Sequence, residues 1–309
     1  MRIVTDNLAF PEGPIAMADG SVLLVEIQRG TLTRVAPDGT TSVVAECGGG
    51  PNGAAIGPDG AVYICNNGGF SWDTVDGLLR PIGTPADYTG GSIQRVDLND
   101  GSVQTLYTHC DERQLRGPND LVFDAAGGFY FTDLGKRHED ALERGSVYYA
   151  LADGSAINRV IGPIEQPNGI ALSPDGKRLY VAETFSARLR CWDITAPGVV
   201  ATHADFFGSD PFAVGPILYG FSGYERLDSM AVDALGNVCV ATLGTGCIST
   251  ISPAGKLVAA HPVPQPDVMV TNICFGGEAM KTAYITSSGR GILYTCDWFS
   301  AGHKLYFNA

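Results

Sequence analysis

The chain has 309 residues, of which 45% are hydrophobic and 17% charged, and its formal net charge is −13. This composition is typical of a folded globular protein and excludes extensive disorder. Binding to nucleic acid or to an anionic membrane requires clustered Lys and Arg, so the acidic balance argues against both partners. The apolar runs are shorter than the roughly 18 residues that a membrane-spanning helix needs, and Asp6 and Asn7 interrupt the start of any signal peptide. We therefore expect a cytoplasmic protein.

The eight cysteines indicate a reducing environment as well. They form no Cys-x-x-Cys pair, and several of them, such as Cys65 and Cys239, lie inside strand-like apolar runs. We expect small buried thiols rather than a disulfide framework or a zinc site.

One sequence unit recurs six times along the chain. In chain order, its first half begins at Pro11, Pro51, Pro118, Pro167, Leu227 and Val270. Each copy contains a polar residue, an apolar stretch, a tight turn and a second apolar stretch, and a second hairpin follows. Two hairpins give four antiparallel strands, which is one blade of a β-propeller.

The repeat therefore predicts an all-β fold, a six-bladed β-propeller that forms a single domain over residues 1–309, with blades of roughly 50 residues. The N-terminal segment Met1–Leu8 resembles the outermost strand that precedes the other repeats. We expect it to pair with the C-terminal blade and to close the ring, because closure removes exposed sheet edges.

Long insertions fall on one face of the predicted ring. Hairpin turns lie on one face of a propeller, whereas connections between blades and between the second and third strands lie on the other. The insertions, all on this second face, are Gly68–Gly90, His109–Gly117, Gly135–Arg144 and Asp205–Arg226. Long loops gathered at one end of a rigid scaffold typically form a binding pocket or its lid. Two of these insertions are rich in aromatic residues, which predict a pocket more apolar than a free sugar would need. They are Phe70, Trp72, Tyr88, Phe206, Phe207, Phe212, Tyr219 and Phe221.

A polar residue opens the inner strand of each repeat, on the same face as the insertions. These six anchor residues are Glu12, Asn52, Asn119, Asn168, Asp228 and Asn272. Because inner strands surround the axis, the anchors would converge there, and buried carboxylates need a cation. Carboxylate and amide oxygens favour hard dications such as Ca²⁺, Mg²⁺ or Mn²⁺. Asn in Pro-Asn-Gly is also a common turn former, and this simpler interpretation stays open for Asn52 and Asn272.

The anchor motifs resemble those of the senescence marker protein/gluconolactonase/luciferin-regenerating enzyme family. This family includes regucalcin, and its site design is similar to that of diisopropyl fluorophosphatase. The resemblance covers nearly the whole chain, and its most specific motifs are Pro11-Glu12-Gly13-Pro14, Gly117-Pro118-Asn119-Asp120, Gln166-Pro167-Asn168-Gly169 and Asp228-Ser229-Met230. It implies lactone hydrolysis at one divalent metal ion. The implied ligands are Glu12, Asn119, Asn168 and Asp228, with Ca²⁺ as the first choice and Zn²⁺, Mg²⁺ or Mn²⁺ as alternatives.

The resemblance also implies contacts to substrate. In some family members the residue that matches Asn119 faces substrate, so metal binding and substrate binding are both open for it. An arginine two positions before that asparagine contacts sugar lactones in regucalcin-like members. Here Arg116 lies three positions before Asn119, and this displacement argues against a simple aldonolactone. Glu183 is a further candidate for substrate binding, because it ends a predicted second strand and opens onto the insertion face.

The expected substrate is a small lactone or ester, and the expected assembly is a monomer or a small homo-oligomer. A bound metal would polarise the carbonyl, and Asp228 would be the catalytic carboxylate, either activating water or attacking directly. A phosphotriesterase-like hydrolase at the same site and a non-catalytic metal-binding propeller stay open as alternatives. The segment Gly220–Tyr224 does not fit Gly-x-Ser-x-Gly, so a serine hydrolase is disfavoured.

Overall fold

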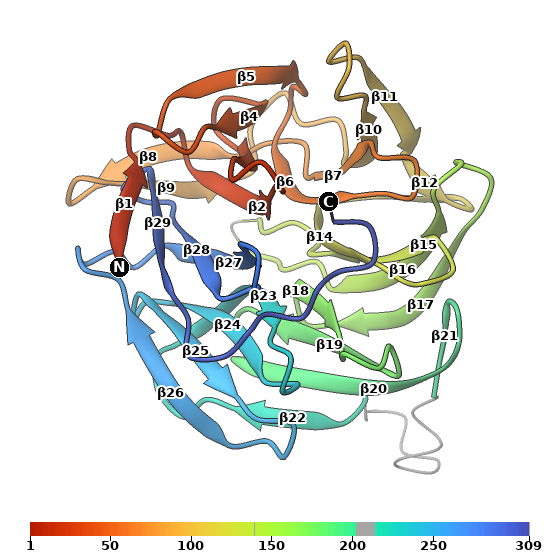
Figure 1. Cartoon of the computed structure of the whole chain (residues 1–309). Coiled ribbons are helices and arrows are strands. Elements are labelled where there is room, and N and C mark those ends of the chain that lie inside the picture. The colour runs from red at the N-terminus through yellow and green to blue at the C-terminus, as the bar shows by residue number, and fades with distance from the viewer. Residues whose placement is uncertain (139, 202–213, 309) are drawn as a thin grey trace.

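The computed structural model describes residues 1–138, 140–201 and 214–308, and this part of the chain contains strands and turns but no helix. Six sheets of four or five strands surround a central axis (Figure 1). The sequence-based prediction of an all-β six-bladed propeller is thus confirmed. No segment in the described ranges forms a helix that could traverse a lipid bilayer.

Each blade is built from consecutive antiparallel strands. Blade 1 consists of β2 (Pro11–Ala16), β3 (Val22–Glu26), β4 (Thr31–Val35) and β5 (Thr41–Glu46). Blade 2 consists of β6 (Pro51–Ile56), β7 (Val62–Asn66), β10 (Ser92–Val96) and β11 (Val103–Tyr107). Blade 3 consists of β14 (Pro118–Phe123), β15 (Gly128–Asp133), β16 (Gly145–Leu151) and β17 (Ile157–Ile164).

The second half of the ring follows the same plan. Blade 4 contains β18 (Pro167–Leu172), β19 (Arg178–Glu183) and β20 (Arg188–Ala196), with two short outer strands described below. Blade 5 consists of β23 (Arg226–Val232), β24 (Val238–Leu243), β25 (Cys247–Ile251) and β26 (Leu257–Pro262). Blade 6 consists of β27 (Val270–Gly276), β28 (Thr282–Ser287), β29 (Ile292–Asp297) and the N-terminal strand β1 (Arg2–Thr5).

The ring is closed by the N-terminal strand. Strand β1 pairs antiparallel with β29, and Ile3 lies opposite Tyr294 in this ladder. The predicted closure is therefore confirmed. It joins the two ends of the chain within one sheet, so the circle of blades has no open edge along the ring.

The outer edge of blade 4 differs from the regular repeat. Strand β21 (Val199–Val200) pairs with the end of β20, whereas β22 (Ile217–Gly220) pairs with its beginning, with Leu189 opposite Tyr219. The edge is thus shared by two segments that lie on either side of residues 202–213. A hydrogen bond of 2.8 Å from the backbone N–H of Gly198 to the Tyr130 hydroxyl links the turn before β21 to blade 3.

Two of the insertions form small hairpins of their own. Strands β8 (Ser71–Val75) and β9 (Leu78–Gly83) make a hairpin between β7 and β10, and β12 (His109–Cys110) pairs with β13 (Arg113–Gln114). The β8–β9 hairpin is fixed to blade 1 by the Trp72 ring, whose centroid lies 5.0 Å from that of Phe10. A backbone hydrogen bond of 2.9 Å from Leu79 N–H to Gly289 C=O ties it to blade 6.

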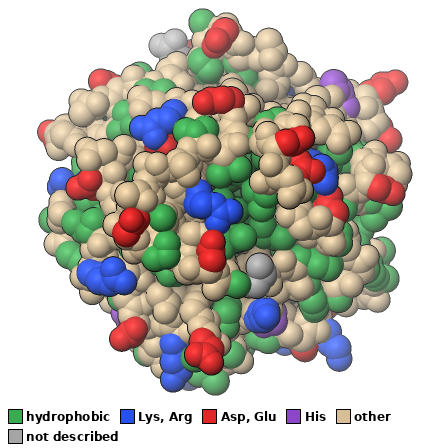
Figure 2. All heavy atoms as spheres, turned by 45° about the horizontal axis from the view of Figure 1, so that its top comes forward, with side chains coloured by type: hydrophobic (Ala, Val, Ile, Leu, Met, Phe, Trp, Pro, Cys, Tyr) green, Lys and Arg blue, Asp and Glu red, His purple; other side chains and the backbone are tan. Residues whose placement is uncertain are grey.

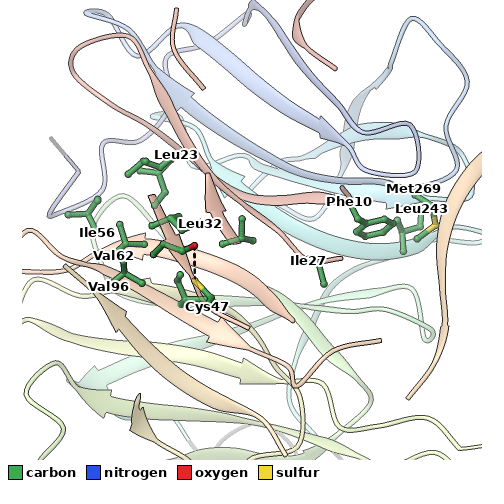
Figure 3. Close-up of a cluster of buried hydrophobic side chains, with 14 residues drawn as sticks. Phe10, Leu23, Ile27, Leu32, Cys47, Ile56, Val62, Val96, Leu243 and Met269 are labelled. Carbon is green, nitrogen blue, oxygen red and sulfur yellow. Dashed lines mark hydrogen bonds between the residues drawn. The ribbon is translucent and has the colours of Figure 1, made fainter. Parts of the chain in front are cut away.

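The apolar core is distributed between neighbouring blades. One buried cluster extends from Leu23, Val62 and Val96 between blades 1 and 2 to Phe10 and Met269 near the axis (Figure 3). All eight cysteines are free, and each is buried or half-buried. Packing of this kind makes every blade depend on its two neighbours, so the position of each inner strand is set by the whole ring.

Glycines after the anchor residues allow the inner strands to approach closely. A Cβ atom at Gly53 would lie 2.5 Å from the Asn119 carbonyl oxygen and 2.6 Å from the Asp120 Cα atom of the next blade. A Cβ atom at Gly169 would lie 2.6 Å from the Asp228 carbonyl oxygen. The Pro-Asn-Gly repeats are therefore explained by packing at the axis, because any side chain after the asparagine would push neighbouring anchors apart.

We predict that Gly53→Ala destabilises the protein by about 1–3 kcal/mol, because the new methyl group overlaps the backbone of blade 3. The free energy of unfolding in urea measures this loss. Gly220→Ala is the matched control, since a Cβ atom there meets nothing within 4 Å. An unchanged Gly53→Ala protein would contradict the close approach of the inner strands.

Candidate active site

A cavity of about 280 Å³ opens where the inner strands begin. Five of the six anchor residues line it, namely Glu12, Asn52, Asn119, Asn168 and Asp228. The sixth, Asn272, reaches the site through a hydrogen bond of 2.7 Å from its Nδ2 to Oε2 of Glu12. The structure therefore brings the four residues predicted as metal ligands to one cavity on the axis.

A second, smaller cavity of about 80 Å³ lies towards the other end of the inner strands. Apolar residues such as Ile15, Leu172 and Phe275 contribute most of its lining, and the C-terminal residues His303 and Leu305 border it. In Figure 1 the C-terminus lies near the middle of the ring. The C-terminal segment therefore covers this end of the central channel. Most of the anchor residues line the larger cavity instead.

Each inner strand has an irregularity in its ladder at the anchor residue. The register shifts between Glu12 and Ile15 in blade 1 and between Leu227 and Met230 in blade 5. The same shift occurs in the other four blades, immediately after Pro51, Pro118, Pro167 and Val270. Because such bulges interrupt the alternation of side chains, they re-aim the anchors without ending the strand.

Three acidic side chains are buried around the axis. Glu12, Asp120 and Asp228 are 2%, 7% and 9% exposed, respectively. Burial raises the pKa of Glu12 well above its usual value, and the negative charges of Asp228 and Asp120 add to this rise. Burial likewise raises the pKa of Asp228 to about 7 and that of Asp120 to about 7. In each case burial is the largest cause, and it outweighs the hydrogen bonds and, for Asp228, the charge of Arg226, which lower the pKa.

Several oxygens at the same place have no partner. Oε1 of Glu12, Oδ1 of Asn119 and Oδ1 of Asn168 are buried and accept no hydrogen bond from any described residue. Buried polar atoms are nearly always paired, so three orphaned acceptors in one cavity call for a donor or a cation. Carboxylate and amide oxygens are the ligands that hard dications prefer. The residues present therefore fit a divalent metal ion.

The amide oxygens are essential to that fit. Among the described residues, no group of three or more His, Cys, Asp and Glu side chains is placed to hold a metal ion on its own. Any ion on the axis would need Asn119 and Asn168 besides the carboxylates. This composition favours calcium or magnesium over zinc, which prefers nitrogen and sulfur ligands.

The position of Glu183 corrects the sequence-based prediction of a substrate contact. Its carboxylate is fully buried, accepts a hydrogen bond of 2.7 Å from Nε of Arg190, and accepts another of 2.6 Å from Oγ of Ser186. It does not line the cavity, although Thr184 and Phe185 do. Because Arg190 is itself buried, Glu183 serves as its counter-ion within blade 4.

Arg116 also lies outside the cavity lining. Its side chain is 49% exposed, and its Nε lies 4.0 Å from Oε2 of Glu143. Its backbone is held by a hydrogen bond of 2.7 Å from its N–H to the Asp133 carboxylate and by one that its C=O accepts from Tyr88. A contact between Arg116 and substrate stays a prediction.

The insertions contribute to the cavity unequally. The segments Gly68–Gly90 and Gly135–Arg144 line it through residues such as Phe70 and Lys136, whereas His109–Gly117 contributes no residue to the lining. Of Asp205–Arg226, residues 205–213, with the predicted pocket aromatics Phe206, Phe207 and Phe212, lie outside the described residues. Of the other predicted aromatics, Phe70 lines the cavity. Tyr219 and Phe221 are not among its lining residues, and they pack edge-to-face against each other with 4.9 Å between ring centroids.

Two site residues were missed by sequence reasoning. Asp120 borders the smaller cavity next to the anchor Asn119, and its charge raises the pKa of Glu12 and of Asp228. It takes the position that glycine occupies in three other repeats, and this exchange was the available signal. Lys136 is 4% exposed, and its Nζ donates hydrogen bonds to the C=O of Asn67 at 2.7 Å and of Gly69 at 3.3 Å. The ammonium lies 4.5 Å from the Tyr88 ring centroid, and burial lowers its pKa to about 8. A lysine in an insertion carries no sequence pattern that reveals such a position.

Comparison with known proteins identifies the family. Residues 10–289 match the sequence profile described as SMP-30/Gluconolactonase/LRE-like region. The chain belongs to the SMP-30/gluconolactonase/LRE-like family. The resemblance inferred from the anchor motifs is therefore confirmed.

Similar SMP-30/gluconolactonase-like proteins include the lactonase drp35 of Staphylococcus saprophyticus, which is 31% identical over 96% of this chain and 85% of its own. The lactonase drp35 of Staphylococcus aureus strain MRSA252 is 30% identical over 93% of this chain and 82% of its own. Among solved structures, the calcium-binding protein regucalcin from Agrobacterium tumefaciens aligns with a TM-score of 0.74 and 17% identity, covering 99% of this chain and 96% of its own. A gluconolactonase from Xanthomonas campestris aligns with a TM-score of 0.72 and 22% identity, covering 96% and 88%. At these identities the two structures establish the fold.

We predict that Glu183→Gln lowers the free energy of unfolding by about 3–5 kcal/mol, because it leaves the buried Arg190 guanidinium without its counter-charge. Urea denaturation measures this loss. Glu46→Gln on the exposed edge of blade 1 is the matched control and should change stability by less than about 0.5 kcal/mol. Unchanged stability of Glu183→Gln would contradict its role as the counter-ion of Arg190 and would leave the predicted substrate contact open.

Proposed function

We propose that this protein is a metal-dependent lactonase whose single divalent ion is held by Glu12, Asn119, Asn168 and Asp228. One observation carries the proposal: three orphaned, buried oxygen acceptors and the Asp228 carboxylate belong to residues that line one cavity. The family relationship supports the reaction, because relatives at about 30% identity over nearly the whole chain are named lactonases. The fold relationship to a gluconolactonase agrees with it.

Calcium is the first candidate for the ion, and Mg²⁺, Mn²⁺ and Zn²⁺ are the alternatives. The ligand set is all oxygen and includes two neutral amides, a composition common in calcium sites and uncommon in zinc sites. The calcium-binding protein regucalcin shares the fold, which supports this order. Asn272 contributes by fixing Glu12 through the hydrogen bond to Oε2, so that Oε1 stays free for the ion.

The chemistry divides between the ion and the protein. A bound dication supplies Lewis-acid polarisation of the lactone carbonyl and stabilises the negative charge that develops on its oxygen. Asp228 takes a proton from the attacking water, the water oxygen bonds to the acyl carbon, and the ring C–O bond breaks. The proton then passes from Asp228 to the departing alkoxide oxygen, which gives the hydroxy acid. Direct attack by the Asp228 carboxylate is the variant of this step.

Two further roles follow from position. Glu12 lies deepest among the charged anchors, at 2% exposure, and acts mainly as a ligand. Asn119 offers one orphaned oxygen, and its amide nitrogen remains available to substrate. The apolar part of the cavity, formed by Phe10, Ile27, Leu243 and Met269, excludes water from one side of the reacting lactone.

We predict that Asp228→Asn preserves the fold and lowers kcat by about 10²–10⁴-fold, because general-base or nucleophilic assistance is lost while the side-chain shape is kept. Initial-rate kinetics on a lactone, with the melting temperature as a check of folding, measure the effect. Asp38→Asn in an exposed turn is the matched control. Retained turnover in Asp228→Asn would exclude its catalytic role.

We also predict that Ca²⁺ at about 100 times its Kd stabilises the protein by about 2.7 kcal/mol and that a chelator reverses this gain. Glu12→Gln should abolish most of the calcium-dependent rise in melting temperature, because it removes one of the two charged ligands, whereas Glu46→Gln should retain it. Stabilisation that survives in Glu12→Gln would place the ion elsewhere.

A substrate panel separates the proposed function from its alternatives. Lactones, aryl esters and organophosphates are assayed with Ca²⁺, with a chelator, and after the metal is restored. Chelator-sensitive lactone turnover is the expected result. Turnover of organophosphates alone would indicate a phosphotriesterase-like enzyme, and calcium binding without turnover of any compound would indicate a non-catalytic propeller.

A further inference from the structure

Basic side chains gather at the cavity in an otherwise acidic protein. The chain has 20 Lys and Arg against 33 Asp and Glu, and on the face shown in Figure 2 the two signs are interspersed. The cavity reverses this balance, because four basic side chains line it against the two acidic anchors. The basic residues are Arg80, Lys136, Arg137 and Arg226.

Two of these four residues have a buried donor without a partner among the described residues. Elsewhere in the described ranges, seven arginines form ion pairs with carboxylates, namely Arg29, Arg34, Arg95, Arg116, Arg144, Arg178 and Arg190. None of the four cavity residues forms such a pair with a described residue. Nε of Arg80 and Nε of Arg226 are, in addition, buried without any hydrogen-bond partner among these residues. Two orphaned guanidinium donors at one cavity indicate a missing acceptor.

Lys136 leaves one donor free as well. An ammonium group has three N–H bonds, and the two recorded hydrogen bonds go to the backbone carbonyls of Asn67 and Gly69. The nearby Asp133 carboxylate is already used by the backbone N–H groups of Arg116, Gly117 and Gly135. The charge of Lys136 is therefore held in place by neutral carbonyls and is not cancelled by a contacting anion.

Contacts with neighbouring residues fix the positions of the basic side chains around the cavity. Arg80 lies on β9, whose hairpin is fixed to blades 1 and 6 by Trp72 and Leu79. Arg226 begins β23, and its guanidinium carbon lies 5.8 Å from the Phe185 ring centroid, a cation–π distance. Arg137 lies 5.9 Å from the same centroid and is exposed at the cavity mouth. Donors that are fixed before binding lose little entropy when they meet an anion.

We propose that Arg80, Lys136 and Arg226 bind a carboxylate group of the substrate, so that the enzyme acts on lactones that carry a carboxylate. This inference rests on the proposed lactonase function and names its substrate class. A carboxylate accepts several charge-assisted hydrogen bonds, and guanidinium groups match its planar geometry. A neutral lactone would leave the same donors buried and unpaired, which disfavours its binding.

The charge arrangement also sets the orientation of the substrate. The basic residues attract an anionic group, whereas at the axis the Glu12 and Asp228 carboxylates offset the charge of the proposed dication. The carboxylate is therefore directed away from the axis, and the lactone carbonyl is left to face Asp228. An alternative explanation is that the basic residues only offset the acidic axis through space, and this explanation requires no substrate anion.

A matched pair of lactones tests the proposal. The probes are γ-carboxy-γ-butyrolactone and its carboxamide, which have nearly the same shape and differ in charge. On the calcium-loaded enzyme we expect kcat/KM for the carboxylate to exceed that for the carboxamide by roughly 10- to 100-fold, the size expected for one charge-assisted hydrogen bond. Arg80→Gln and Lys136→Met should each reduce this ratio by a similar factor. The ratio should stay unchanged in Arg178→Gln, the matched control on the outer surface of blade 4, and in Lys136→Arg it should be largely restored.

Binding of a ketone analogue separates this inference from the proposed function. In cyclopentanone carboxylate a CH₂ group replaces the ring oxygen, so the compound cannot be hydrolysed. Calorimetry should show that the wild type binds it and that Arg80→Gln binds it roughly 10-fold more weakly. Binding of this kind without turnover of any lactone would support the anion site and overturn the lactonase function. Turnover of both lactones at equal kcat/KM would support the function and overturn the anion site, as would a ratio that is the same in wild type and variants. If a variant fails to fold, the wild-type ratio still decides the question.

Discussion

The structure depends on a set of buried carboxyl groups that the protein does not neutralise. Elsewhere in the ring, buried acids have built-in partners: Glu183 has Arg190, and Glu26 has Arg29 and Thr33. At the axis, Glu12, Asp120 and Asp228 have no ion pair with a described basic residue. The charges of Asp228 and Asp120 raise the pKa of Glu12, and the charge of Asp120 raises that of Asp228. Buried carboxyl groups without a counter-ion fit the divalent ion that we propose for this site.

The geometry of that centre is a property of the closed ring. The anchors belong to six different strands, so no local segment can position two of them by itself. Close approach at Gly53 and Gly169 brings neighbouring inner strands together, and the ladder irregularities re-aim the anchors. The pairing of β1 with β29 then completes the ring that holds all six starts around one axis. The energy that organises the ligands therefore comes from packing between blades, and the ion does not need to assemble the site.

The sequence was sufficient for those features that repeat. Six copies of one unit predicted the blades, the closing strand and the anchors Glu12, Asn119, Asn168 and Asp228, because the period places equivalent residues at equivalent points of the ring. It was insufficient where a contact joins residues outside the repeat. Glu183 was predicted to contact substrate because its partner Arg190 lies one strand away, and no pattern marks such a pair. Lys136 and Arg80 lie in insertions, where only the folded chain shows which side chains turn towards the cavity.

The candidate site combines residues that belong to the sequence repeat with residues that belong to the insertions between strands. The axial carboxylates and amides come from the repeat, and any change there disturbs both the ion and the packing of neighbouring blades. The cationic side chains come from the β8–β9 hairpin, from the segment after Gly135 and from the start of β23. Such connecting segments tolerate substitution more easily than the inner strands do. In the proposed enzyme, the basic side chains would hold the carboxylate of the lactone while its carbonyl faces the axial residues. On this proposal, the inner strands would supply the groups for the reaction, whereas the hairpin and loops would supply the groups that select the substrate.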